Sequence, residues 1–442
     1  MKKINLFFLI LLSATLSAQQ TDRQVILTQM RKAAKELLIE NLYPRNIDTA
    51  YGGYLSTFTY DFKPTGDQDK MIVTQARHIW STAKAAEFFH DSSYIAMARH
   101  GFHFLRDKMW DREMGGFYTL VTRSGEPKSP MKDAYGNSFA IYGLAAYYAA
   151  SKDEEALELA KKGFLWLEEH SHDPNHKGYF QHLERNGTPV VRQASTPQGS
   201  DLGFKDQNSS IHLLEALTEL YSVWKDPLVK ERLQEMLLLI RDTMVGNKGY
   251  LTLFFYPDWT PVSNRDSSRA IILERKSIDH VSFGHDVETA FLMMEASEAL
   301  GIEHDPKTWE TGKTMVDHSL ATGWDNKKGG FYDEGYYFKD KPGKMTIIKN
   351  TKNWWAQSEG LNTLMIFSEI YPKDKMNYFD KFKKLWNYAN TNLIDHQYGD
   401  WYEYGIDDSP KSKTALKGHI WKGTYHSFRS LMNCIRRLEK NG

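Results

Sequence analysis

One short pattern recurs along the chain and limits what it can fold into: an Asp, then five positions later a Gly, then an aromatic residue. Full copies lie at residues 48–54, 111–117, 173–179 and 325–331. A fifth copy at 395–401 has Asp in place of the Gly, and a sixth, Gly249-Tyr250, lacks the leading Asp. The Gly positions or their equivalents are 63, 62, 71, 81 and 70 residues apart. Such near-regular spacing is typical of a protein built from repeats.

Helical patterns fill the intervals between these marks. Apolar residues follow a period near 3.6 in one segment of each repeat, at residues 72–90, 138–148, 211–224, 287–300, 355–371 and 425–438. More charged, amphipathic segments accompany several of them, at residues 92–109, 154–170 and 227–243. An apolar helix is typically buried and an amphipathic helix lies at the surface. Each repeat therefore predicts a hairpin of one inner and one outer helix.

Six hairpins that close on themselves predict an all-α fold, the (α/α)6 toroid, with short β-strands in the loops at one mouth. No Gly/Ser-rich linker or block of charge divides the chain, so residues 19–442 are expected to form a single domain. An open helical solenoid is the alternative. Two polar insertions, at 193–204 and 260–275, are expected to overhang the mouth, either as a cover for a substrate or as plain surface loops.

The first 18 residues have the pattern of a signal peptide. Lys2 and Lys3 precede an apolar run at 4–16 that is too short to span a bilayer, and Ser17-Ala18 offers a small-residue cleavage point. We therefore expect an exported protein, periplasmic or secreted. No later segment stays apolar for a membrane-spanning length, so we expect no membrane contact after cleavage. Cys434 is the only cysteine and has no partner for an internal disulfide.

Composition points to a small-molecule partner. The 56 basic and 56 acidic residues balance, which argues against nucleic acid or an anionic membrane as the main partner. The 12 Trp and 24 Tyr offer apolar faces with polar edges, which suit stacking on sugar rings, although most are expected in the core. We expect a sugar-binding protein that is a monomer or a weak dimer.

Polar side chains stand at the starts of the predicted inner helices, where a plain core would have none. Arg77 lies in an otherwise apolar segment, and a buried Arg needs a partner or a polar ligand. Asn208 and His212 are four residues apart, and His285 and Glu288 are three apart, so each pair shares a helical face. The inner helices converge on one cavity, and His is the side chain best suited to move protons near neutral pH.

Other kinds of active site are less well supported by the sequence. No Gly-x-Ser-x-Gly elbow, phosphate loop or dinucleotide fingerprint is present. The histidines near residue 172 do not have the spacing of a common metal-ligand set. Glu288 and Glu359 remain candidates for the paired carboxylates of a glycoside hydrolase, because nothing in the sequence determines how far apart they lie.

At these positions the chain resembles the N-acylglucosamine 2-epimerase superfamily, and within it most closely the cellobiose and mannobiose 2-epimerases. The resemblance covers residues 51–437 and rests on six segments: QARHIW at 75–80, YGNSFAIYGL at 135–144, NSSIHLLEAL at 208–217, GHDVETAF at 284–291, WWAQSE at 354–359 and WKGTYHSFR at 421–429. It implies an (α/α)6 barrel that acts on a reducing mono- or disaccharide and uses neither a metal nor an organic cofactor.

The resemblance also implies roles for individual residues. His285 and His426 would flank C2 of the opened sugar, one removing the proton to give a cis-enediolate and the other returning it on the opposite face. His212 would assist ring opening, and Arg77 would stabilise the enediolate. Glu288 would orient or tune His285 and contact sugar hydroxyls. The remaining implied contacts to the sugar are hydroxyl binding by Tyr135, Asn208 and Glu359, and stacking by Trp355 and Trp421.

The function that the sequence predicts is therefore epimerisation at C2 of the reducing-end sugar of a disaccharide. Three alternatives remain open: a monosaccharide or N-acylhexosamine 2-epimerase or aldose–ketose isomerase, a glycoside hydrolase on the same toroid, and a carbohydrate-binding protein without catalysis.

Overall fold

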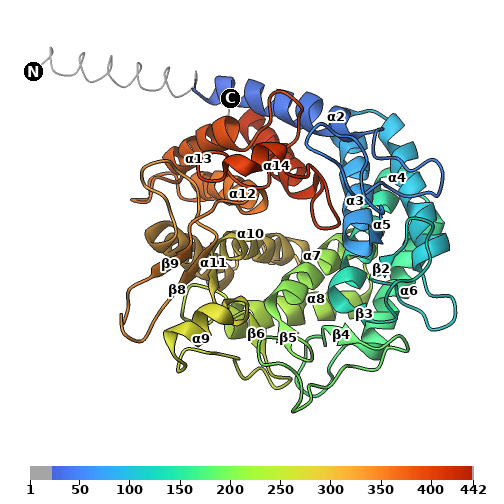
Figure 1. Cartoon of the computed structure of the whole chain (residues 1–442), viewed down its shortest axis with the longest axis horizontal. Coiled ribbons are helices and arrows are strands. Elements are labelled where there is room, and N and C mark those ends of the chain that lie inside the picture. Colours follow the sequence, from blue (N-terminus) through green and yellow to red (C-terminus); the bar gives the residue numbers. More distant parts are fainter. Residues whose placement is uncertain (1–21, 441–442) are drawn as a thin grey trace, which may run out of the picture.

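The computed structural model describes residues 22–440 (Figure 1). The predicted signal peptide, residues 1–18, lies outside the described residues. Helices form a closed ring in the view of Figure 1, with the earliest and latest described segments side by side at its top. None of the helices in the described range is long and apolar enough to cross a membrane.

Six helices form the inner ring. They are α3 (Ile72–Phe89), α5 (Ala134–Ser151), α7 (Gln207–Val223), α10 (Phe283–Ala299), α12 (Trp354–Ile370) and α14 (Tyr425–Lys440). Each packs against the next, and α14 packs against α3, which closes the ring. In α3 and α5 almost every residue up to the last turn is buried, because these helices contact neighbours on all sides. The predicted (α/α)6 toroid is confirmed, and the open solenoid is not.

The outer ring covers these helices. It contains the helical residues 22–42, which include α2 (Glu40–Leu42), and α4 (Ser93–Phe104), α6 (Glu154–His170), α8 (Pro227–Leu239), α11 (Pro306–Thr322) and α13 (Tyr378–Asn392). The bounds of α6 agree with the predicted segment. The inner helices α5, α7 and α10 begin four residues before their apolar patterns do, because their first turns carry polar residues.

Short antiparallel strands lie at the starts of the inner helices. The pairs are β1 (Lys70–Met71) with β2 (Leu120–Val121), β3 (Lys132–Asp133) with β4 (His182–Leu183), and β5 (Lys205–Asp206) with β6 (Phe254–Phe255). A three-stranded sheet joins β7 (Val281–Ser282), β8 (Glu334–Tyr336) and β9 (Thr346–Lys349). Because β1, β3, β5 and β7 run directly into α3, α5, α7 and α10, these strands lie at the mouth where the inner helices begin.

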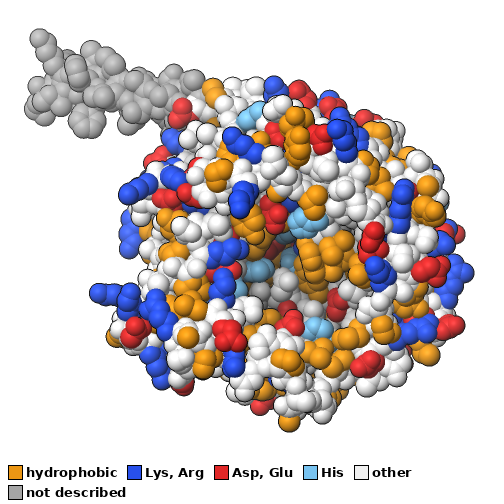
Figure 2. All heavy atoms as spheres, viewed as in Figure 1, with side chains coloured by type: hydrophobic (Ala, Val, Ile, Leu, Met, Phe, Trp, Pro, Cys, Tyr) orange, Lys and Arg blue, Asp and Glu red, His pale blue; other side chains and the backbone are white. Residues whose placement is uncertain are grey.

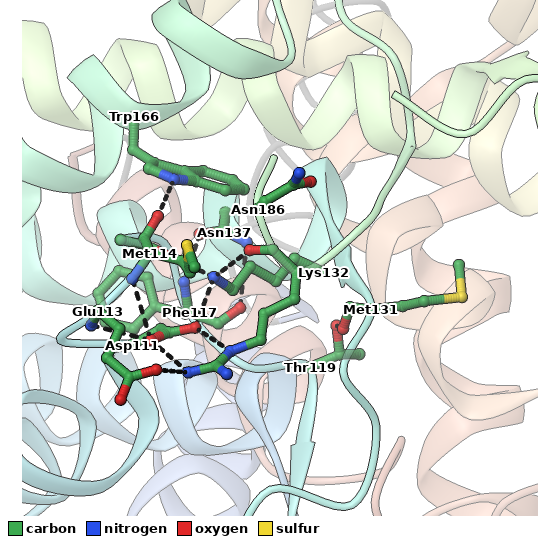
Figure 3. Close-up of polar contacts among 12 residues, drawn as sticks. Asp111, Glu113, Met114, Phe117, Thr119, Met131, Lys132, Asn137, Trp166 and Asn186 are labelled. Atoms are coloured by element: carbon green, nitrogen blue, oxygen red, sulfur yellow. Dashed lines mark hydrogen bonds and ion pairs between the residues drawn. The ribbon is translucent and has the colours of Figure 1, made fainter. Parts of the chain in front are cut away.

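The leading Asp of the recurring pattern is one half of a buried ion pair. Figure 3 shows one such corner, where Asp111 accepts a hydrogen bond from Lys132 Nζ at 3.0 Å and from the backbone N–H groups of Glu113 and Met114. Burial by itself would raise the pKa of Asp111, but hydrogen bonds from Arg185 and Lys132 hold it well below its usual value. Equivalent pairs, 2.6 to 2.9 Å long, are Asp48–Lys70, Asp173–Lys205, Asp325–Lys352 and Asp395–Lys417.

The Gly of the pattern is required by backbone conformation. Left-handed φ angles between 59° and 90° occur at all the pattern positions, namely Gly53, Gly116, Gly178, Gly249, Gly330 and Asp400. Gly adopts this region without strain, and Asp is among the few other residues that enter it routinely. Asp400 thus substitutes for Gly with the same backbone shape.

One corner has lost the ion pair entirely. The position of the leading Asp before Gly249 is Met244, and the first residue of β7, where β1, β3 and β5 have Lys, is Val281. Both are buried. A buried charge without its partner is strongly destabilising, so the two charges have been replaced together by apolar side chains.

The two polar insertions lie at the strand end of the ring. The first connects β4 to β5, and the second follows β6 and contains α9 (Arg269–Glu274). The side chain of Arg275 donates a hydrogen bond to Gln198, which joins the insertions to each other. Ile272 of α9 packs with Tyr336 and Phe338 in a small separate apolar cluster. Both insertions therefore adjoin the strands at this mouth, and their overhang across it stays a prediction.

Candidate functional site

A polar cavity of about 210 Å³ opens at the mouth where the inner helices begin. It is lined by Arg77, Tyr135, Asn208, His212, His285, Glu288, Trp354, Trp355, Trp421 and His426. Figure 2 shows the hollow at the centre of the ring, with His side chains inside it. Nine of the ten sequence-predicted site residues line this one cavity, although they are spread over 350 positions of the chain. Glu359 does not line it.

The helix starts bring these side chains together. Tyr135, Asn208 and His426 are each the second residue of α5, α7 and α14, and His285 is the third residue of α10. In a ring of inner helices that begin at one mouth, side chains of the first two turns point toward a common centre. Trp421 comes from the loop before α14 and is 47% exposed, so it stands at the entrance.

His285 has a hydroxyl partner. Its Nδ1 lies 2.7 Å from Ser282 Oγ, the last residue of β7, and its ring centre lies 4.7 Å from that of Trp355. Burial lowers the pKa of His285 to about 3, with smaller contributions from His212, His280 and Arg77. The ring is therefore a neutral imidazole at physiological pH. Because Nδ1 is engaged by Ser282, Nε2 is the nitrogen left for a substrate.

His426 has a carboxylate partner instead. Its Nδ1 lies 2.6 Å from Glu359 Oε1, and its ring centre lies 5.8 Å from that of Trp355. Burial, and then the positive charges of Arg77 and Arg429, lower the pKa of His426 well below its ordinary value. This imidazole is also neutral, and its Nε2 is the nitrogen without a protein partner among the described contacts.

His212 is oriented by the next turn of its own helix. Its Nδ1 lies 2.9 Å from Glu215 Oε2, and its ring packs against the rings of Tyr135 and Phe139. Burial would raise the pKa of Glu215, but Arg429 and His212 bring it down to about 2. Glu215 is therefore an ionised acceptor for this imidazole.

Arg77 offers unused hydrogen-bond donors to the cavity. Its Nη2 donates to the hydroxyl of Tyr135 at 3.1 Å, and its guanidinium lies over the rings of Phe139 and Tyr425, 4.2 and 5.0 Å from their centres. Its Nε is buried without a partner among the described residues. A buried donor left unpaired is destabilising by about 1 to 3 kcal/mol, so this group suits an oxygen atom of a bound ligand.

Sequence reasoning missed the residue that connects the carboxylates. Arg429 is 3% exposed and contacts three of them: Nη1 donates to Glu215, and Nη2 lies 2.5 Å from Glu288 Oε1 and 2.7 Å from Glu359 Oε1. The hydroxyl of Tyr425 also donates to Glu215. A buried arginine has to be paired, and Arg429 lies within the last of the matched segments, three residues after His426. That spacing was the available signal.

Two predicted roles need correction. Glu288 was expected to tune His285, but its Oε1 contacts Arg429 and lies 3.9 Å from His426 Nδ1, while Ser282 is the partner of His285. Glu359 was expected to bind sugar hydroxyls. It is fully buried and supports His426 from behind, because the first turn of α12 points Trp355, not Glu359, into the cavity.

The same cluster has the donor types of a cation site. One ligand atom each from Glu288, Glu359 and His426 lie within 4.8 Å of one another. The guanidinium of Arg429 already contacts both carboxylates, so it supplies positive charge at the place where a metal ion would be attracted.

Comparison with known proteins supports a common family. The profile of the N-acylglucosamine 2-epimerase (GlcNAc 2-epimerase) family matches residues 53–430. A cellobiose 2-epimerase from Ruminococcus albus is 28% identical over 88% of this chain and 93% of its own, and one from Dictyoglomus turgidum is 26% identical with the same coverage. The solved structure of a cellobiose 2-epimerase from Spirochaeta thermophila has 26% identity and a TM-score of 0.80, covering 95% of this chain and 98% of that one.

Proposed function

Because the chain belongs to the N-acylglucosamine 2-epimerase family and is a carbohydrate epimerase, an isomerase, we propose that it epimerises C2 of the reducing-end sugar of a disaccharide. The observation that carries this proposal is that His285 and His426, from α10 and α14, line one cavity and present neutral imidazoles to it.

Two such bases suit the chemistry of C2. The proton on C2 becomes acidic only when the sugar ring is open and C1 is a carbonyl. One imidazole Nε2 then removes that proton, and the electron pair of the C–H bond forms the C1–C2 double bond of a cis-enediolate. The other histidine, which has to carry a proton on its own Nε2 at this point, gives that proton to C2 on the opposite face and so inverts that carbon. The first histidine keeps the proton that it removed, and exchange with solvent resets both rings. General acid–base catalysis of this kind contributes about 10²- to 10⁴-fold.

Arg77 and His212 support this step. Arg77 lines the cavity, and its guanidinium would bind the enediolate oxygens, where negative charge develops. His212, held by Glu215, would move the proton between O5 and O1 during ring opening and closing. Tyr135 and Asn208 would bind hydroxyls of the same sugar.

The tryptophans favour a disaccharide over a monosaccharide. Trp355 contacts both His285 and His426, so it would stack on the reacting sugar. Trp421 stands at the entrance with nearly half of its surface exposed, and its ring centre lies 6.5 Å from that of Tyr135. An exposed indole there suits a second sugar attached to the first.

A glycoside hydrolase is less well supported by the geometry. That reaction needs two carboxyl groups on either side of the scissile bond, about 5 to 9.5 Å apart. Glu288 and Glu359 instead contact the same nitrogen of Arg429, and Glu359 does not reach the cavity.

A further proposal concerns location: residues 1–18 direct export, which N-terminal sequencing of the mature protein from culture fractions would test.

Incubation with sugars in deuterated water tests the proposal. Purified protein is mixed with cellobiose, mannobiose or mannose, and the products are followed by NMR. Deuterium at C2 together with a new 2-epimer of the disaccharide is the expected result. A ketose product would indicate aldose–ketose isomerisation, released monosaccharides would indicate hydrolysis, and binding without exchange would indicate a non-catalytic protein. Each of these three results would overturn the proposal.

A further inference from the structure

Arg429 lies beneath the catalytic cavity and is bound to acidic groups from three inner helices. The carboxylates of Glu215, Glu288 and Glu359 belong to α7, α10 and α12, and Arg429 itself belongs to α14. Its Nη1 contacts Glu215, and its Nη2 contacts both Glu288 and Glu359. Arg429 does not line the cavity, so its role is not contact with the sugar.

Two of these carboxylates in turn each contact Nδ1 of a histidine that lines the cavity. Glu215 lies 2.9 Å from His212 Nδ1, and Glu359 lies 2.6 Å from His426 Nδ1. A continuous chain of contacts therefore runs His212–Glu215–Arg429–Glu359–His426 across the floor of the site. His285 is outside this chain, because its Nδ1 contacts Ser282.

We propose that Arg429 is a positioning residue for the reaction: by pairing with Glu215 and Glu359 it keeps both as acceptors for Nδ1–H, so that His212 and His426 present an unprotonated Nε2 to the sugar. This inference rests on the proposed function and names a residue that acts through others.

The physical reason is that burial of a carboxylate without a counter-charge costs free energy. Glu359 is fully buried and Oε2 has no partner among the described residues. Burial raises the pKa of Glu359 well above its ordinary value, Arg429 opposes that rise, and the neighbouring Glu288 adds to it. Removal of Arg429 would therefore raise the pKa of this carboxyl further. A protonated Glu359 would donate to Nδ1 and move the imidazole proton to Nε2, the wrong nitrogen for a base. The tautomer of a catalytic His is set in this way by the partner of its other nitrogen.

Replacement of Arg429 tests the proposal directly. Arg429→Met removes the positive charge. Arg429→Lys keeps the charge but has one nitrogen in place of the two that contact Glu215 and Glu359. The ring nitrogens of His212 and His426 are then assigned by ¹⁵N NMR without any substrate. In Arg429→Met we expect His212 and His426 to lose the tautomer with the proton on Nδ1. The tautomer of His285 should not change. For a histidine in the wrong tautomer, kcat falls on the order of 100-fold or more, while KM changes less than about threefold.

The matched control is Arg437→Met, on the same helix, whose guanidinium contacts Glu369 away from this cluster. It should leave both tautomers and kcat unchanged. If Arg429→Met does not fold, Glu215→Gln and Glu359→Gln carry the test, since the first should change only His212 and the second only His426. Unchanged tautomers in folded Arg429 variants, or in both Gln variants, would overturn the proposal. Failure of the proposed function is separate, because it would appear as no C2 exchange in the unmodified protein.

Discussion

His285 and His426 contact the same indole: their ring centres lie 4.7 and 5.8 Å from that of Trp355. The two helices that carry them, α10 and α14, are not neighbours in the ring, since α12 packs between them. Trp355, from the first turn of α12, bridges the two histidines. The reaction proposed for C2 depends on this arrangement.

Replacement of either histidine should stop proton exchange at C2. His426→Ala and His285→Ala each remove one of the two groups that we propose to act on C2. Exchange in deuterated water should then fall below detection while the far-UV circular dichroism spectrum stays unchanged. His90→Ala, at the C-terminal end of α3, is the matched control and should retain activity. Exchange at the original rate in a folded His426→Ala protein would refute the assignment.

Ser282→Ala should reduce turnover without weakening substrate binding. The hydroxyl engages His285 Nδ1 at 2.7 Å and does not line the cavity. Without it the ring loses its orienting contact, and kcat should fall about 10-fold, the low end of effects seen for groups that support a reactive histidine. Ser282→Thr, which keeps a hydroxyl, should recover part of the loss. Steady-state kinetics that show a change in KM alone would contradict this role.

Trp421→Ala should discriminate between disaccharides and monosaccharides. The loss of an exposed stacking surface removes binding that is equal in the ground state and the transition state, which raises KM and leaves kcat unchanged. We expect KM for cellobiose to rise about 5- to 30-fold, equivalent to about 1 to 2 kcal/mol. The rate with mannose, which has no second sugar, should change little. An equal loss for both sugars would place Trp421 at the reacting sugar instead.

The buried ion pairs of the corners should be replaceable only as pairs. Lys352 Nζ lies 2.7 Å from Asp325 Oδ2, and its removal leaves a buried carboxylate. Lys352→Val or Asp325→Met should each destabilise the protein by about 3 to 5 kcal/mol. The double variant, which copies Met244 and Val281 of another corner, should lose less than the sum. Urea unfolding of the single and double variants measures this coupling, and strict additivity would contradict it.

Stability should fall as pH decreases below neutrality, in part through His78. Its Nδ1 contacts the hydroxyl of Tyr43 at 2.7 Å, and burial lowers its pKa to about 3. In the unfolded chain a His binds a proton below about pH 6.5. Between these two values the unfolded state binds more protons, so the stability present above pH 6.5 is lost progressively toward pH 3.

His78→Gln removes this contribution. Urea unfolding at pH 5, 6 and 7 should show a slope that is smaller than that of the unmodified protein by up to about 1.4 kcal/mol per pH unit. An unchanged slope would mean that His78 becomes protonated in the folded protein. His285, with a pKa of about 3, should contribute in the same direction.

The fold could be predicted from the sequence because the patterns that specify it are local. Asp, Gly and an aromatic residue in fixed order specify a turn with a left-handed residue, and the apolar segments between turns specify buried helices. What could not be predicted was the start of the inner helices α5, α7 and α10. In α5, Tyr135 precedes the apolar pattern at Ser138 because it faces a polar cavity. Hydrophobic periodicity therefore does not reveal the first turn of a helix whose residues line the site.

The site was predicted less completely than the fold. His285 and His426 could be identified because their segments resemble those of a known family. Arg429 could not be assigned a role, because its contacts join helices far apart in the chain: Glu215 and Arg429 are 214 positions apart. Ser282 and Glu215 each lie three positions from the histidine that they contact, so their spacing was an available signal that sequence reasoning did not use. The role of Glu359 was misjudged because only packing decides which side of α12 faces the cavity.

Closure of the ring has a consequence for incomplete chains. The helix that closes the ring against α3 is α14, which also carries His426 and Arg429. A polypeptide that stops before residue 425 would expose the apolar flanks of α3 and α12 and leave Glu215, Glu288 and Glu359 without their common cation. Such a product would be prone to aggregation and unable to turn over sugar, so α14 is required for both solubility and activity.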